Sequence, residues 1–219
     1  MTTILVIQER LIALGYKPGT ADGIDGPKTR EAVKAFQRDK GVTADGKVGP
    51  VTHTLLFETE TRSAAASTSA AAVIEKQAKA TRKIVEIIVH CTATPERRDY
   101  SLETIRKWHL ERGWNDIGYH YVVHPDGVIE AGRPEAKVGS HVAGHNSGTL
   151  GIVYVGGVAA DGKTPKDTRT AAQKAALLDL AKALIAKYPA IKKVTGHNQY
   201  AAKACPSFDV RRDPLGALV

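Results

Sequence analysis

A low-complexity tract between residues 58 and 80 constrains the folding of this chain more than any other feature. The tract is rich in Ala, Ser and Thr and has almost no large apolar side chains, so it cannot bury enough surface to build a core. We expect a linker there, and its second part, near residues 73–83, is rich in Ala and Lys and can be helical. The chain of 219 residues then divides into a small first domain, residues 1–57, and a larger second domain, residues 81–219.

The composition excludes several classes of protein. The hydrophobic content of 42% is that of an ordinary globular chain, and two cysteines are too few for a disulfide framework. No stretch is long and apolar enough to span a membrane. The net charge of +8 favours polyanions, but aromatic residues make up only 5% and no dense Lys/Arg block occurs. We therefore expect no nucleic-acid partner and no membrane insertion, and we expect a monomer.

The first domain contains a short internal repeat. The segment 22–29, Asp-Gly-Ile-Asp-Gly-Pro-Lys-Thr, recurs at 45–52 as Asp-Gly-Lys-Val-Gly-Pro-Val-Thr. Each copy is a turn followed by Pro at a first helical position. Helices are predicted over residues 4–14, 27–40 and 50–57, with Gly15 and Gly41 in C-terminal caps. The predicted apolar core of this all-α, three-helix domain consists of Leu11, Leu14, Val33 and Phe36.

The second domain alternates strand and helix signals. Apolar or alternating runs predict strands over residues 84–89, 119–124, 128–131, 150–155 and 191–195. Helical spacing of apolar residues predicts helices over 102–112 and 168–188. This order predicts an α/β domain with a mixed sheet and flanking helices.

Three side chains in the second domain have the composition of a catalytic zinc site. His90 follows one predicted strand, His197 follows another, and Cys205 lies on the loop after His197. Ligands in open α/β sheets gather beyond the carboxyl ends of strands. Two imidazoles and one thiolate would leave the fourth position of zinc open for water. If the three meet in space, the chain is a metallohydrolase.

A Gly-rich loop over residues 139–146 supplies candidates for contact with substrate. We expect this loop near the groove, and its candidates are His141, His145 and Asn146. Other residues are predicted to be structural or exposed. His120 alternates with Tyr119 along a strand and points to the opposite face, whereas His124 precedes a hairpin turn and is predicted to be exposed.

The first domain contains Leu14-Gly15-Tyr16, Ala32-Val33, Phe36-Gln37 and the two Asp-Gly turns in one ordered series from Gln8 to Thr52. This series covers nearly the whole segment and resembles the peptidoglycan-binding domain found at the ends of many cell-wall hydrolases. The same residues are explained by turn and cap chemistry, so they indicate this fold more firmly than this ligand.

The second domain contains a series of separate motifs, namely Val89-His90-Cys91-Thr92-Ala93-Thr94, Gly118-Tyr119-His120-Tyr121, Gly139-Ser140-His141, Gly196-His197 and Lys203-Ala204-Cys205-Pro206-Ser207-Phe208-Asp209. In their order and spacing, from about residue 85 to 210, they resemble the zinc-dependent N-acetylmuramoyl-L-alanine amidases. The similarity is greatest to the small phage lysozymes of that family, which are related to the peptidoglycan recognition proteins. The whole chain resembles a modular phage endolysin.

The resemblance implies a function and a set of site residues. It implies Zn²⁺ on His90, His197 and Cys205, catalytic roles for Tyr119 and Lys203 that the sequence does not divide, and bacterial peptidoglycan as the partner. The reaction implied is cleavage of the amide between N-acetylmuramic acid and L-alanine of the stem peptide during phage lysis. The first residues lack a basic leader, so we expect synthesis in the host cytoplasm and action on the wall after the inner membrane is permeabilised.

Two alternatives remain open at this point. The chain could be a peptidoglycan recognition module without catalysis, or a zinc peptidase of the stem peptide. Recognition modules of this fold are expected to lose the cysteine ligand, so Cys205 favours the enzyme. The chain has no His-Glu-x-x-His helix, which argues against the common type of zinc peptidase.

Overall fold

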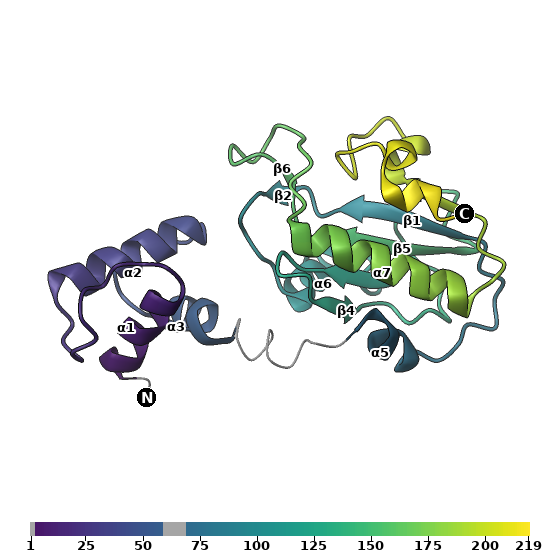
Figure 1. Cartoon of the computed structure of the whole chain (residues 1–219). Helices are drawn as coiled ribbons and strands as arrows, with labels where there is room; N and C mark the ends of the chain where they lie inside the picture. The colour runs from purple at the N-terminus through teal and green to yellow at the C-terminus, as the bar shows by residue number, and fades with distance from the viewer. Residues whose placement is uncertain (1–2, 59–68) are drawn as a thin grey trace. The chain divides into compact units, whose positions relative to one another are not determined.

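The computed structural model describes residues 3–58 and 69–219 and divides into two compact units (Figure 1). The first unit comprises the described residues up to 58, and the second comprises residues 69–219. Across these two ranges, no helix combines the length and apolar character that a bilayer span requires.

The first unit consists of short helices. They are α1 (Ile4–Ala13), α2 (Pro27–Asp39) and α3 (Pro50–His53), which continues into a π-helical turn, η1 (Thr54–Glu58). Gly15 and Gly41 follow the first two helices at φ 85° and 68°, in the left-handed conformation that a C-terminal cap requires. The three predicted helices are therefore present, and the third changes its hydrogen-bonding pattern after one turn.

The core of the first unit lies between α1, α2 and η1. Its buried members are Ile7, Leu11, Ala32, Val33, Phe36 and Leu56. The prediction that Leu14 belongs to this core is wrong, because α1 ends at Ala13 and the Leu14 side chain is 37% exposed.

A buried glutamine organises the first copy of the repeat. Gln8 Nε2 donates to Asp22 Oδ1 at 2.9 Å, to the Ile24 carbonyl at 3.1 Å and to Thr29 Oγ1 at 3.0 Å. The Gly23 amide donates to Gln8 Oε1 at 2.8 Å. The amide of one side chain therefore ties the turn to α1 and α2.

The second copy of the repeat builds the same arrangement around Gln37. Its Nε2 donates to Asp45 Oδ1 at 2.8 Å, to the Lys47 carbonyl at 2.9 Å and to Thr52 Oγ1 at 3.0 Å. The Gly46 amide donates to Gln37 Oε1 at 2.8 Å. The sequence repeat is thus a repeat of one buried hydrogen-bond network.

The second unit contains a five-stranded mixed sheet in the order β4-β3-β5-β1-β7. Its strands are β1 (Glu86–Cys91), β3 (Tyr121–Val123), β4 (Ile129–Ala131), β5 (Thr149–Tyr154) and β7 (Lys193–Gly196). Strand β1 pairs in parallel with β5 and with β7, and only the β3–β4 pair is antiparallel. A separate two-stranded sheet joins β2 (Thr94–Pro95) to β6 (Gly157–Val158). The predicted mixed-sheet α/β class is confirmed.

Helices cover both faces of the five-stranded sheet. The long helix α7 (Ala171–Lys187) packs with the short helix α5 (Ala70–Glu75) on one face, against Ile87, Val89 and Ile152 (Figure 1). The opposite face carries Val122 and Val153, which pack with Ile105 of α6 (Leu102–Leu110). His90 alternates with Val89 along β1, so its side chain lies on the face opposite α7.

Part of the predicted linker belongs to the second unit. Residues 59–68 lie outside the described residues, but the later part of the tract forms α5, and Val73, Ile74 and Ala80 are buried in the main core. The Ala80 amide donates to the Tyr188 hydroxyl at 2.8 Å, and Lys187 Nζ donates to the Ile74 carbonyl at 3.0 Å. The second unit therefore begins before residue 81, because small apolar residues of this segment fit against the end of α7.

Candidate metal centre

Two parallel strands bring the two predicted imidazole ligands to one edge of the sheet. Strand β1 is shifted two residues beyond the predicted range, so His90 lies inside it and not after it. Val89 pairs with Gly196 of β7, and His197 follows Gly196 in the short 3₁₀ helix η2 (His197–Gln199). The ring centroids of His90 and His197 are therefore only 4.8 Å apart.

Cys205 completes the cluster from the loop that follows η2. One possible ligand atom from each of His90, His197 and Cys205 lies within 4.8 Å of the other two. His90 Nδ1 is 3.7 Å from Cys205 Sγ, and a tetrahedral zinc ion separates a nitrogen and a sulfur ligand by about 3.6 Å. The donor set and its spacing fit zinc.

Burial sets the protonation of the imidazoles. His90 is fully buried, and burial lowers the pKa of its imidazolium well below 6.5, with further lowering by His141, His197 and Lys203. Burial and the charge of Lys203 also lower the pKa of His197. Both side chains are thus neutral near pH 7, which is the form of imidazole that binds a metal ion.

The surroundings of Cys205 favour its neutral thiol over its thiolate unless a cation is bound nearby. The neighbouring Cys91 thiol and burial both raise the pKa of Cys205. The Cys91 amide donates to Cys205 Sγ at 3.3 Å and so can support negative charge on the sulfur. A divalent cation at the cluster would lower the pKa of Cys205, because it stabilises the thiolate directly. Cys91 itself belongs to the apolar core on the other side of β1.

The two predicted catalytic residues lie beside the cluster. The Tyr119 ring centroid is 5.2 Å from that of His90, and burial raises the pKa of its phenol. Lys203 is exposed, and its charge lowers the pKa of both His90 and His197. The ammonium group therefore acts electrostatically on the same cluster.

The three candidates for substrate contact have different surroundings. His141 is 6% exposed, and its ring nitrogens lie 3.1 Å from His90 Nε2 and 3.3 Å from Thr149 Oγ1. Asn146 Oδ1 accepts from the His141 and Val142 amides. Both ring nitrogens of His141 have protein partners, and the Asn146 side-chain oxygen accepts from its own loop, so substrate contact by these two residues stays a prediction. His145 alone is exposed, with its ring 4.3 Å from that of Tyr200.

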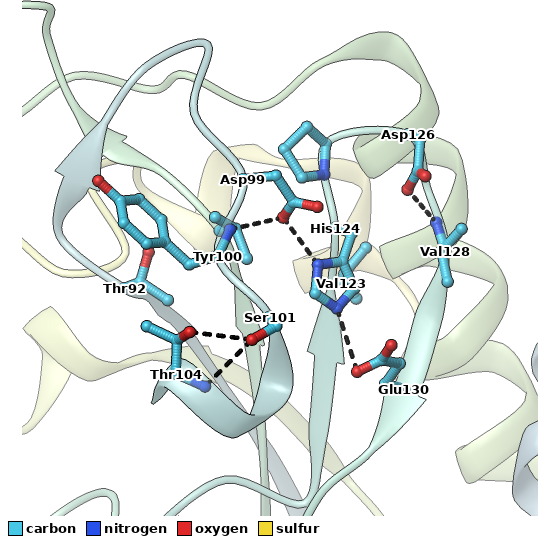
Figure 2. Close-up of polar contacts among 12 residues, drawn as sticks. Thr92, Asp99, Tyr100, Ser101, Thr104, Val123, His124, Asp126, Val128 and Glu130 are labelled. Carbon is cyan, nitrogen blue, oxygen red and sulfur yellow. Dashed lines mark hydrogen bonds and ion pairs between the residues drawn. The ribbon is translucent and has the colours of Figure 1, made fainter. Parts of the chain in front are cut away.

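A second buried histidine was predicted to be exposed. His124 is fully buried, with Nδ1 at 2.8 Å from Asp99 Oδ1 and Nε2 at 3.5 Å from Glu130 Oε2 (Figure 2). Asp99 lies on the segment before α6, and Glu130 lies on β4. His124 thus joins that segment to the β3–β4 hairpin. His120, which was predicted to be structural, is buried, and its Nδ1 accepts from the Gly151 amide at 2.9 Å.

Sequence reasoning missed two positions beside His141. Gly151 lies in the middle of a buried strand, where a Cβ atom would meet His141 Cδ2 at 2.6 Å. An isolated glycine inside a strand is a signal of close approach, and this signal was present in the sequence. Thr149, two residues earlier on the same face, gave no comparable signal.

The first unit has a pocket of about 410 Å³ at the first copy of the repeat. Its lining includes Pro18, Gly19, Asp22, Ile24 and Lys28, and Ile24 is 65% exposed. A pocket with both polar and apolar side chains in its lining is suited to a ligand that has both kinds of surface.

The fold and the cluster define a class of protein. The second unit is a mixed-sheet α/β domain with two imidazoles and a thiol placed to share a cation. The family model for N-acetylmuramoyl-L-alanine amidase matches residues 80–208, and the one described as "Putative peptidoglycan binding domain" matches residues 2–56. The chain belongs to the N-acetylmuramoyl-L-alanine amidase family.

Individual relatives agree with this membership. The endolysin of Klebsiella phage KP32 is 45% identical over 127 residues, which cover 58% of this chain and 83% of the endolysin. The endolysin of Escherichia phage T7 is 44% identical over 126 residues, which cover 58% of this chain and 82% of that protein. The N-acetylmuramoyl-L-alanine amidase LysC from Clostridium intestinale URNW superposes with a TM-score of 0.54 at 29% identity, over 62% of this chain and 85% of LysC.

Proposed function

We propose that this peptidoglycan hydrolase acts in phage lysis by cleaving the amide between the lactyl group of N-acetylmuramic acid and L-alanine, with Zn²⁺ as its cofactor. Hydrolysis breaks the C–N bond, adds hydroxyl to the carbonyl carbon and leaves the proton on the alanine nitrogen. The observation that carries the proposal is the convergence of His90, His197 and Cys205 within 4.8 Å, in a chain of the amidase family.

The three convergent residues would hold the metal. A zinc ion held there supplies Lewis-acid chemistry, which makes water a usable nucleophile near neutral pH. His90 and His197 offer neutral imidazoles because burial lowers the pKa of both. Cys205 completes a three-ligand set, which leaves room for water and substrate.

Lys203 and Tyr119 would stabilise the oxygen on which charge develops. Lys203 lies two residues before Cys205, and its ammonium already acts on both histidines. A positive charge at this place favours an oxyanion over the neutral carbonyl. Burial raises the pKa of Tyr119, so its hydroxyl stays protonated near pH 7. We therefore assign Tyr119 the role of a hydrogen-bond donor and not that of a general base.

The first unit would hold the enzyme on its polymeric substrate. Its family match is to a peptidoglycan-binding domain, and the pocket beside Ile24 and Lys28 is the candidate binding surface. Of the three candidates for substrate contact in the second unit, His145 is the best placed, because its ring is exposed. The endolysin relatives support synthesis in the host cytoplasm and action on the wall after the inner membrane opens.

Mass spectrometry of digested peptidoglycan tests the reaction. The expected products are stem peptides with a free L-alanine amino terminus and glycan strands with free lactyl carboxylates, without new reducing sugar ends. Removal of metal with a chelator should abolish product formation, and zinc should restore it. New termini inside the stem peptide would instead identify a peptidase, and binding without any product would identify a recognition module.

A further inference from the structure

The ring of His141 occupies a space that the backbone keeps open for it. A Cβ atom on Gly139 would lie 2.4 Å from His141 Cδ2, and one on Gly151 would lie 2.6 Å from the same atom. Real side chains do not approach so closely, so larger residues at either position would displace the ring. Glycines in two separate segments, the loop before β5 and β5 itself, therefore leave room for the imidazole ring.

Hydrogen bonds within the loop fix the backbone of His141. Asn146 Oδ1 accepts from the His141 amide at 2.8 Å and from the Val142 amide at 2.9 Å. The ring lies in T-shaped contact with His90, at a centroid distance of 5.0 Å. The position of His141 is thus determined by the protein alone.

Hydrogen-bond donors and acceptors determine which nitrogen of each ring carries a proton. Thr149 Oγ1 lies 2.8 Å from the His145 carbonyl and 3.1 Å from the Asn146 carbonyl. Carbonyl oxygens only accept, so the single hydroxyl proton of Thr149 points toward them. Toward His141 the Thr149 oxygen must then be the acceptor, which places the proton of His141 on Nε2.

The position of the proton on His141 determines the position of the proton on His90. A neutral imidazole with its proton on Nε2 accepts at Nδ1, and His141 Nδ1 lies 3.1 Å from His90 Nε2. His90 Nε2 must therefore carry a proton and donate it to His141. The other nitrogen of His90, Nδ1, keeps its lone pair and lies 3.7 Å from Cys205 Sγ.

We propose that His141 is a positioning residue that holds His90 as its Nε2–H tautomer, with the Nδ1 lone pair directed at the cation site. The inference rests on the proposed function as far as zinc is concerned. Each group in the chain donates to the next: His90 to His141, His141 to Thr149, and Thr149 to the backbone carbonyls of the loop. Partners of this kind orient metal-binding imidazoles and raise their basicity.

Zinc affinity measured by competition with a chelator tests the inference. His141→Leu removes the acceptor and should weaken zinc binding about 10–100-fold. His141→Asn places an amide oxygen near the position of Nδ1 and should recover most of that loss. His145→Leu is the matched control, because the network uses only the backbone carbonyl of His145, and its zinc affinity should equal that of the unsubstituted protein.

The tautomer of His90 gives a second readout that needs no metal and no variant. Nitrogen-15 NMR of the metal-free protein should show His90 protonated at Nε2 and unprotonated at Nδ1. Protonation at Nδ1 would overturn the inference, and so would equal zinc affinities for His141→Leu and the unsubstituted protein. Absence of zinc binding by the unsubstituted protein would instead contradict the proposed cofactor, while the tautomer measurement would still decide the role of His141.

Discussion

The two units contain buried polar networks that differ in one respect. The Gln37 amide is 1% exposed, and its nitrogen and oxygen pair with groups of the first unit alone. His90 is fully buried; its Nε2 pairs with His141, while its Nδ1 lies 3.7 Å from Cys205 Sγ, in the cluster that also contains His197. The first network is closed, whereas the second ends at Nδ1 of His90 and the Cys205 sulfur, two possible metal ligands that we call its open end. A closed network maintains a fold, whereas ligand atoms gathered at the end of a network are a place for a cation.

The largest expected effect comes from removing a ligand at the open end. Cys205→Ser should lower turnover of peptidoglycan at least ~10³-fold, which corresponds to about 4 kcal/mol of transition-state stabilisation. The free energy of unfolding of the metal-free protein should change little, because a serine oxygen can still accept from the Cys91 amide. Product release and chemical denaturation measure the two quantities. Retention of turnover in Cys205→Ser would remove the basis for a zinc mechanism.

The next effect concerns the charge beside the open end. Lys203→Met keeps the length of the side chain and removes the ammonium, so kcat should fall about 10²–10³-fold. Zinc affinity should not decrease, since a positive charge beside the site disfavours a cation. Steady-state kinetics on soluble muropeptides, with Lys203→Arg as the charge-preserving control, separates the two effects. Equal kcat values for Lys203→Met and the unsubstituted protein would contradict the oxyanion role.

Breaking a closed network should change stability and not chemistry. Gln37→Leu leaves the Gly46 amide and Thr52 hydroxyl without their partner, which should destabilise the first unit by about 2–3 kcal/mol. Hydrolysis of soluble fragments by the second unit should be unchanged. Arg38→Gln, an exposed neighbour on α2, is the matched control for denaturation. Loss of hydrolysis on soluble fragments in Gln37→Leu would contradict the separation of the two roles.

The smallest expected effect is a difference in pH dependence between the units. Burial lowers the pKa of both His109 and His120 to about 4. Below about pH 6.5 the unfolded histidines bind protons that the folded ones do not, so the free energy of unfolding of the second unit falls as pH decreases from 6.5 toward 4. For the fully buried His120 the loss is on the order of 1–3 kcal/mol.

The first unit supplies the internal reference for that measurement. Its glutamine amides do not titrate. A hydrogen bond from the Gln8 side chain lowers the pKa of the Asp22 carboxyl. The pKa of the Asp45 carboxyl is also lowered, chiefly by a hydrogen bond from the Lys47 amide. The two carboxylates therefore contribute to the free energy of unfolding of the first unit above about pH 3.8, and this contribution is lost only as the pH falls further. Thermal unfolding of the full chain at pH 7 and pH 5, followed by amide NMR signals of each unit, should show a decrease for the second unit alone. A parallel decrease in both would contradict the assignment to buried histidines.

Much of the fold could be predicted from local patterns. The Asp-Gly turns with Pro at the start of the next helix, and glycines at helix ends, are short-range signals that set the first unit. Strand and helix order in the second unit followed from apolar periodicity, and the mixed sheet is confirmed. The end of β1 was misplaced by two residues, because pairing with β5 on one side extends the strand beyond its apolar run.

The candidate site could be predicted only in part. His90, His197 and Cys205 were recognisable because each lies at a strand end or in a loop that follows one, and the structure brings them together. The roles of His141 and His124 depend on neighbours far away in the sequence, such as His90 and Asp99. A Gly-rich loop and a hairpin turn both suggest exposed side chains, and nothing in the local sequence indicates that other segments bury His141 and His124.

The sequence by itself determined the division into units, the repeated turn and the candidate ligand set, because these depend on residue type and spacing along the chain. Only the tertiary structure decided that residues 70–80 join the second core and that His141 faces His90. It also decided that one glutamine closes each repeat. The physical reason is that burial and hydrogen-bond direction are properties of neighbours in space, and most of those neighbours are distant in the chain.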